Sequence, residues 1–271
     1  MDIPQGLPSK IEGVLRRVQK KLTTNHQPKE ILQTSQKKIT KNLESYKCPI
    51  CDDTGWIYNN EKKLYVKCNC VDKQKALDLL IKTGLTKEQL KTSFKNFIAW
   101  NKEVKEMKEI ATSYYLSFEK IKDTDNNSIA LLGESGSGKT HLISALINNF
   151  VTNKNIDIAY ISYIDTLIEL KQNVLNSDVY QSKLNRYKKA KILVIDDLFK
   201  GGYTDSDVRI ILEIINYRYS SNLPFMISSE LFINDLIKID KALGGRIAER
   251  TREYIYEIKG TKNNYRLSKK I

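Results

Sequence analysis

The chain has 271 residues, with 45 lysines and arginines against 32 aspartates and glutamates, which gives a formal net charge of +13. Hydrophobic residues make up 41% of it, which excludes a disordered low-complexity polymer and allows one large core plus a smaller module. Because no run of 18 apolar residues and no signal-peptide segment occurs, we expect a cytoplasmic protein with no membrane partner. The positive charge suggests nucleic acid as a partner, although lysine-rich sequence can equally reflect genomic base composition.

The first 45 residues are basic and have helical periodicity. Ser9-x-x-Glu12 forms a capping box before apolar residues at helical spacing, which predicts a helix to about Leu22. A second, weaker helix is predicted from Glu30 to Leu43. Because two short helices bury little surface alone, we expect them to pack on the next module or on a partner.

All four cysteines lie close together, as Cys48-x-x-Cys51 followed by Cys68-x-Cys70. Two close thiol pairs separated by a loop are typical of a structural Zn²⁺ site, whereas a secreted disulfide framework would spread its pairs along the chain. The alternative is four unrelated buried or free cysteines. We predict a basic helical and zinc-binding module at residues 1–71, whose four thiolates fill the coordination of the ion and leave no catalytic water.

Residues 72–93 are expected to form a helix and a linker, within which Thr86-x-x-Gln89 begins a further helix. From residue 94 to residue 271 the pattern becomes that of an α/β domain, beginning with a long amphipathic helix from about Val104 to Ile121. Short apolar runs then occur at 129–132, 158–161, 192–195, 225–227 and 254–258, and helices fit the gaps at 139–151, 163–175, 205–219 and 231–250. This alternation predicts a five-stranded parallel sheet with helices on both faces.

The first predicted strand runs into a complete G-x-x-x-x-G-K-T motif. The motif and the residue after it are Gly133, Glu134, Ser135, Gly136, Ser137, Gly138, Lys139, Thr140 and His141. In such a loop the backbone N–H groups surround phosphates, the lysine reaches the β- and γ-phosphates, and the threonine hydroxyl ligates Mg²⁺. An ordinary Gly-Ser turn is the alternative, but a strand before the motif and a helix after it favour binding of ATP and Mg²⁺. For His141 we expect a role in packing or in supporting the residues that contact the nucleotide.

A second motif follows the strand at 192–195, which ends in Asp196 and Asp197. Both carboxylates then lie at the carboxyl end of the sheet, where ligands of such sheets bind. We expect Asp196 to contact Mg²⁺, directly or through water, and Asp197 to polarise the water that attacks the γ-phosphate. The alternative is a pair of solvated acids that cap the following loop.

Taken together, these motifs resemble those of the DnaC/DnaI-type replicative helicase loaders, a branch of the P-loop AAA+ ATPases. The resemblance covers roughly three quarters of the chain, and it includes Phe94-x-x-Phe97, Ile215-Asn216-Tyr-Arg218-Tyr219 and Gly245-Arg246-Ile-x-x-Arg250 besides the cysteine and phosphate motifs. The chain looks most like the Gram-positive and phage-borne loaders, which carry an N-terminal zinc module.

This resemblance implies an ATP-dependent loader that binds the hexameric replicative DNA helicase and delivers it onto single-stranded DNA. The zinc module would contact the helicase, and the ATPase domain would associate with copies of itself. Arg250 matches the arginine finger that completes a neighbour's site and Arg246 is the second candidate, although both could belong to a solvated helix face. A basic run with Tyr180 and Tyr187 among it would contact DNA or form a solvated face: Lys183, Arg186, Lys188, Lys189 and Lys191.

Two departures from the family pattern bear on activity. The fourth strand ends in Ser228-Ser229-Glu230, where loaders usually have Thr-Ser-Asn with an asparagine that senses the γ-phosphate. Because a glutamate repels phosphate unless it is protonated or turned away, either Ser229 takes this role or hydrolysis is weak. Only residues 260–271 follow the last strand, too few for a helical lid, which leaves Arg266 as the candidate sensor arginine. We therefore expect a weak ATPase that depends on assembly.

Two other functions stay open. One is an IstB-like transposition helper ATPase, which shares the same core but usually lacks the cysteine module and binds duplex DNA. The other is a zinc-dependent, helicase-binding scaffold with little ATP turnover.

Overall fold

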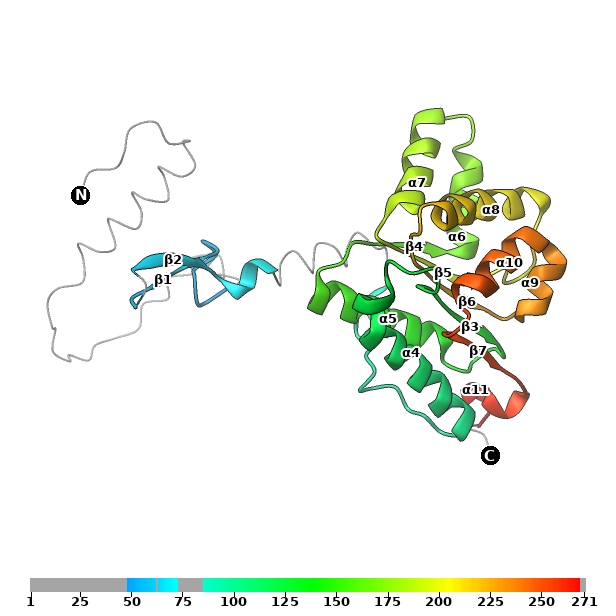
Figure 1. Cartoon of the computed structure of the whole chain (residues 1–271), viewed down its shortest axis with the longest axis horizontal. Coiled ribbons are helices and arrows are strands. Elements are labelled where there is room, and N and C mark those ends of the chain that lie inside the picture. The colour runs from blue at the N-terminus through cyan, green and yellow to red at the C-terminus, as the bar shows by residue number, and fades with distance from the viewer. Residues whose placement is uncertain (1–47, 62, 73–84, 269–271) are drawn as a thin grey trace, which may run out of the picture. The chain divides into compact units, whose positions relative to one another are not determined.

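The computed structural model describes residues 48–61, 63–72 and 85–268, which comprise a small cysteine hairpin and an α/β domain (Figure 1). The helices expected between residues 9 and 43, and the helix end expected near Gly84, lie outside the described residues. Within the described part of the chain, no helix is both long enough and apolar enough to cross a membrane.

The cysteine hairpin consists of two short antiparallel strands, β1 (Trp56–Asn59) and β2 (Leu64–Lys67). Tyr58 pairs with Tyr65 across the hairpin, and their rings meet edge to face at 5.2 Å. Ile57, on the opposite face, packs against the buried cysteines. Trp56 and Tyr65 remain 56% and 55% exposed, so the hairpin buries little apolar surface besides its cysteines.

The α/β domain is built on five parallel strands, as the sequence predicts. In the order in which they lie across the sheet, these are β4 (Ile158–Ser162), β5 (Ile192–Leu198), β6 (Phe225–Ser229), β3 (Ile129–Gly133) and β7 (Ile255–Ile258). This order puts β3, β5 and β6 side by side in the middle of the sheet. The carboxyl ends of these three strands therefore lie together. They carry the phosphate loop, the Asp196-Asp197 pair and Ser228-Ser229-Glu230.

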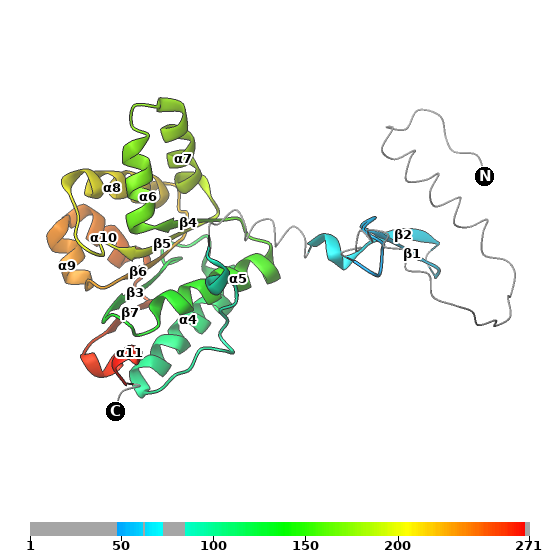
Figure 2. The ribbon, with the colours of Figure 1, turned by 180° about the vertical axis from the view of Figure 1, so that it is seen from behind.

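Helices cover both faces of the sheet (Figure 2). On one face, α4 (Lys102–Ile121) and α5 (Lys139–Lys154) pack against Ile129, Leu131 and the strand residues in register with them. On the other face, Ala130 and Leu132 contribute to a second core with five helices: α6 (Tyr163–Gln172), α7 (Ser177–Lys189), α8 (Asp205–Ser220), α9 (Ile233–Ile239) and α10 (Lys241–Arg250). Alternate residues of β3 thus pack into the two cores on opposite faces of the sheet.

The helix expected at 231–250 is in fact two helices. The chain leaves the helical conformation at Asp240, whose carboxylate accepts a hydrogen bond of 2.7 Å from the Leu243 N–H and so begins α10. The helix expected at 163–175 ends at Gln172, and the basic run that follows forms most of α7.

Residues 85–93, which we expected to belong to a linker, pack on the α/β domain. Thr86 and Gln89 form the predicted capping box at the start of α3 (Lys87–Leu90), and Leu85 joins the core next to α5. The Asn148 side-chain amide on α5 donates to the carbonyl oxygens of Gln89, Leu90 and Thr92 at 2.8–3.2 Å. This segment is therefore fixed to the helix that follows the phosphate loop.

Candidate nucleotide and metal sites

The phosphate loop joins β3 to α5, and its glycines have positive φ angles. At Gly138 φ is 94°, and a Cβ atom there would lie 2.7 Å from the Phe97 ring. A Cβ atom at Gly136 would collide with the Asn264 side chain. Chain segments from before and after the sheet thus press on the loop, so these two positions accept only glycine.

Lys139 points back into this loop. Its Nζ donates to the carbonyl oxygens of Gly133 and Glu134, both at 2.7 Å. Burial lowers the pKa of Lys139 to about 8, against the opposing effect of the Glu230 charge. The ammonium group is therefore only weakly solvated, which favours its exchange onto a phosphate group.

Thr140 and Asp196 lie together, as a Mg²⁺ site requires. The Thr140 hydroxyl donates to Asp196 Oδ1 at 3.1 Å. Asp196 also accepts hydrogen bonds from the hydroxyls of Ser228 and of Tyr160, the latter at 2.9 Å. Burial raises the pKa of Asp196, and a divalent cation would offset that cost of burying a carboxylate. Hydroxyl and carboxylate oxygens are the ligands that Mg²⁺ prefers, so these residues fit the ion.

Asp197 lies in β5, at an irregularity close to the end of the strand. Its φ is 57°, the pairing with β6 shifts between Ile195 and Leu198, and its N–H donates to the Ser228 hydroxyl at 2.8 Å. Its carboxylate accepts a bond of 2.7 Å from Lys200 Nζ. Lys200 belongs to none of the motifs predicted from the sequence, although its position three residues after Asp197 fits an interaction across a turn.

A cleft of about 340 Å³ opens beside Lys139, Thr140 and Asp197. The phosphate loop forms one wall, and the other lining residues are Asp197, Lys200, Glu230, Tyr265 and Arg266. The last two come from the short helix α11 (Tyr265–Ser268), which the Tyr265 N–H joins to the loop by a 3.0 Å bond to the Gly136 carbonyl. Arg266, the late arginine noted in the sequence, thus reaches the same cleft as Lys139.

The end of β6 differs from the expectation. Ser229 is fully buried and its hydroxyl donates to the Leu198 carbonyl at 2.7 Å, so it does not line the cleft. Glu230 does line it, so it is not turned away. The Ser135 side chain, with further help from Lys200 and Lys139, holds the pKa of Glu230 below its usual range.

His141 lies beside the cleft in a packed position. Its Nε2 is 3.0 Å from Asn96 Oδ1, and its ring meets that of Phe97 edge to face at 5.2 Å. These contacts join the start of α5 to the segment before α4, in keeping with a packing role.

The four cysteines form one cluster. All four Sγ atoms lie within 4.8 Å of one another, with 3.8 Å between Cys48 and Cys68 and 3.3 Å between Cys51 and Cys70. Four thiolates about 2.3 Å from one Zn²⁺ would be about 3.8 Å apart, so the cluster fits this ion. Backbone N–H groups of Cys51 and Ile50 lower the pKa of the Cys48 thiol to about 7, whereas the neighbouring Cys51 thiol raises the pKa of Cys70, a cost that a bound cation would offset.

Residues 68–271, about three quarters of the chain, match the family described as IstB-like ATP binding protein. The chain belongs to this family. It is 42% identical over 216 residues to the uncharacterized protein YqaM of Bacillus subtilis, which covers 76% of this chain and 68% of that protein. It is 35% identical over 224 residues to the phage-like element PBSX protein XkdC of the same species, covering 79% and 83%.

Solved structures confirm the AAA+ fold of this IstB-like protein. The crystal structure of the DnaC helicase loader superposes with a TM-score of 0.55 at 19% identity, over 64% of this chain and 100% of that one. A putative primosome component from Streptococcus pyogenes serotype M3 gives 0.51 at 20% identity, over 66% and 91%. The resemblance to the DnaC helicase loader is therefore confirmed in fold, and the family is that of the IstB-like ATP binding proteins.

The two candidate finger arginines lie at the opposite end of the sheet from the cleft. Arg250 is buried, with Nη2 donating to the Tyr219 carbonyl at 2.7 Å and Nη1 bonded to Asn222. Arg246 is half-buried and lies over the Tyr219 ring at 5.4 Å. In the single subunit, the Arg250 guanidinium is thus bound within its own fold, and Arg246 is the more accessible of the two.

The basic run on α7 is largely paired within the chain. Ion pairs join Lys183 to Glu169, Arg186 to Asp157, and Lys188 to Glu213. Tyr180 and Tyr187 pack against the second core, which does not favour the expected stacking of these rings on DNA bases. In the described ranges, Lys189 and Lys191 are the members of this run that are exposed and have no ion pair.

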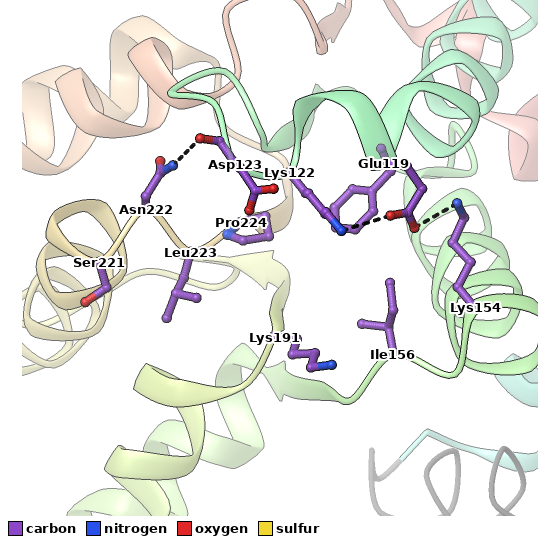
Figure 3. Close-up of a pocket in the computed structure, with 11 residues that line it drawn as sticks. Glu119, Lys122, Asp123, Lys154, Ile156, Lys191, Ser221, Asn222, Leu223 and Pro224 are labelled. Atoms are coloured by element: carbon purple, nitrogen blue, oxygen red, sulfur yellow. Dashed lines mark hydrogen bonds and ion pairs between the residues drawn. The ribbon is translucent and has the colours of Figure 1, made fainter.

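A second hollow, of about 520 Å³, lies at the amino ends of the strands (Figure 3). Lys122 and Lys154 both point toward Glu119, at 3.0 and 3.2 Å, and the Asn222 amide donates to the Asp123 carbonyl at 2.8 Å. Glu119 is the carboxylate partner of both lysines, which partly neutralises their charge in this hollow.

Proposed function

We propose that this protein is an ATP-dependent loader that binds the hexameric replicative DNA helicase and delivers it onto single-stranded DNA during replication initiation. The observation that carries the proposal is the combination of a complete nucleotide cleft with a separate four-cysteine hairpin. The fold shared with the DnaC helicase loader supports it, as does the homology to a protein of a phage-like element.

In the nucleotide cleft, the loop N–H groups and Lys139 would bind the ATP phosphates, and Thr140 and Asp196 would hold Mg²⁺. The ion would neutralise phosphate charge when bound. Asp197 would accept a proton from the attacking water, and its position in the cleft lining, with a bond from Lys200, supports this role. Arg246 or Arg250 would act on the nucleotide of a neighbouring copy, which makes hydrolysis depend on self-association.

The cysteine hairpin would hold Zn²⁺ and contact the helicase. Trp56, Tyr58 and Tyr65 are about half exposed there, and exposed aromatic residues are enriched at the centres of protein interfaces. With Zn²⁺ bound, the cluster would fix the loops that carry β1 and β2, so metal loss would remove this surface.

A capture experiment with the helicase of the same cell or phage tests the proposal. The tagged full-length chain should retain the hexameric helicase with ATP, and Cys48→Ser or Tyr65→Ala should abolish or weaken capture. Tyr203→Ala is the matched control, because Tyr203 is equally exposed but lies in the ATPase domain. If the wild-type chain captures no helicase with ATP, with ADP or without nucleotide, the proposal is wrong.

The family match itself favours a second candidate, a transposition helper ATPase. The matched region begins at residue 68 and so leaves Cys48 and Cys51 outside it. Competition between duplex and single-stranded DNA separates the two functions, because a transposition helper should prefer duplex.

ATP turnover with helicase and DNA present, compared with that of Asp197→Asn, tests the scaffold alternative: equal rates would favour a scaffold.

A further inference from the structure

Glu230 occupies an unusual place for an acidic side chain, inside a cleft that is built to bind phosphates. It follows β6 directly, where the bond between the Ser229 hydroxyl and the Leu198 carbonyl fixes the end of the strand. Its carboxylate lies 3.6 Å from Lys200 Nζ, and it lines the cleft together with Ser135 of the phosphate loop. Its side chain is 37% exposed, so solvent and ligand can both reach it.

Lys200 is held over the same cleft by the turn after β5. Asp197 and Phe199 have φ angles of 57° and 62°, and the Lys200 N–H donates to the Asp197 carbonyl at 3.0 Å. This turn directs the ammonium group to Asp197 and to Glu230, at 2.7 and 3.6 Å. Lys200 thus has two carboxylate partners at the nucleotide cleft.

The partners of Glu230 are those that a phosphate group would use. Lys200 forms an ion pair with it, the charge of Lys139 acts on it, and Ser135 of the phosphate loop lines the same cleft. The same contacts hold the pKa of Glu230 low, so its negative charge persists at neutral pH. A terminal phosphate near this position would meet a fixed negative charge and would compete for the same cations.

We propose that Glu230 is an internal competitor of the terminal phosphate of ATP, and that Lys200 is the cation for which the two compete. ATP must draw Lys200 away from Glu230, whereas ADP, which lacks the γ-phosphate, leaves this pair intact. The pair therefore sets the preference of the cleft for ATP over ADP. This inference rests on the nucleotide cleft of the proposed function but not on the helicase as partner.

Equilibrium titrations with fluorescent ATP and ADP analogues in Mg²⁺ test this pair on the full chain. Glu230→Gln should tighten ATP binding about tenfold and change ADP binding less than about twofold, because only the γ-phosphate meets the removed charge. Lys200→Met should weaken ATP binding by about tenfold, again with little effect on ADP. Glu253→Gln removes the same charge near the amino end of β3 and should change neither affinity.

The double variant gives the decisive measurement. If Glu230 competes for Lys200, then Lys200→Met should weaken ATP binding more in the Glu230→Gln background than in the wild type. The inference is overturned if Glu230→Gln leaves the ratio of ATP affinity to ADP affinity unchanged. Because the ratio of ATP affinity to ADP affinity does not depend on the fraction of folded protein, a partly unfolded variant would still give a valid result. Helicase capture, measured separately, shows whether the loader proposal stands or fails independently of this result.

Discussion

Asp196 at the carboxyl end of the parallel sheet and Arg218 at its amino end are both buried charged side chains, but they have different partners. At the carboxyl end, Asp196 is bonded to the hydroxyls of Thr140, Ser228 and Tyr160. At the amino end, the fully buried Arg218 of α8 donates only to backbone carbonyl oxygens, those of Tyr187, Lys188, Ala190, Lys191 and Pro224.

This difference separates a structural end of the sheet from a functional one. Carbonyl oxygens are fixed by the fold, so Arg218 ties the end of α7 to the starts of β5 and β6 although burial lowers its pKa to about 9. Hydroxyl and ammonium groups can rotate toward a ligand without moving the backbone. We therefore expect substitutions at the amino end to change stability, and those at the carboxyl end to change binding.

The largest expected effect is that of Arg218→Met. It leaves several buried carbonyl oxygens without a donor and should lower the free energy of unfolding by about 3–5 kcal/mol. Urea unfolding followed by circular dichroism measures it. Arg209→Met, an exposed position on the same helix, is the control and should cost less than about 0.5 kcal/mol. A cost below about 1 kcal/mol for Arg218→Met would contradict the structural role.

Lys139→Ala should show the opposite behaviour at the other end of the sheet. The loss of its charge-assisted bonds to phosphate should weaken ATP binding by about a hundredfold, which corresponds to about 2.7 kcal/mol. Stability should change by less than about 1 kcal/mol, because Lys139 bonds only to carbonyls of its own loop. Nucleotide titration and urea unfolding of the same preparation measure both. A large loss of stability would remove the distinction between the two ends.

The strands, the phosphate loop and the aspartate pair could be predicted because their signals are local in the sequence. Strand order is not local, and it is the order of β4, β5 and β6 that brings Tyr160 and Ser228 to Asp196. The sequence shows Glu230 as a departure from the family pattern, but its place in the cleft and its pair with Lys200 depend on tertiary packing.

The two candidate finger arginines also show what sequence periodicity cannot predict. The spacing of Arg246 and Arg250 on one helix predicts a shared face, and both do contact the Tyr219 ring. Periodicity could not show that Asn222, at a φ of 52°, would reach Arg250 and bind its guanidinium. Burial of Tyr180 and Tyr187 depends likewise on the way α7 packs, which charge spacing does not report.

Arg250→Ala and Arg246→Ala sharpen the comparison at the amino end. Arg250→Ala should lower the free energy of unfolding by about 2 kcal/mol, because the Tyr219 carbonyl and the Asn222 amide oxygen lose a charged donor. Arg246→Ala loses mainly a contact with the Tyr219 ring and should cost about 0.5 kcal/mol. Urea unfolding of the two variants at one protein concentration measures this difference. Equal costs would show that the intramolecular bonds of Arg250 contribute nothing net to the fold.

The smallest expected effect tests whether hydroxyl partners at the carboxyl end affect metal binding. Tyr160 accepts a bond of 3.0 Å from the Gln89 amide and donates to Asp196, so Tyr160→Phe leaves one carboxylate oxygen less restrained. It should cost about 1 kcal/mol of stability and raise the Mg²⁺ concentration for half-maximal ATP binding about tenfold, the lower end of the range for contacts that orient metal ligands.

Tyr163→Phe is the matched control for this change, because its hydroxyl donates to the Gly202 carbonyl at 3.3 Å and not to Asp196. Both variants lose one tyrosine hydroxyl from a largely buried ring, so a similar small loss of stability is expected from each. Only Tyr160→Phe should shift the Mg²⁺ titration. If both variants shift it, or neither does, the hydroxyls around Asp196 serve the fold in the same way as the carbonyls around Arg218, and the two ends of the sheet do not differ as we infer.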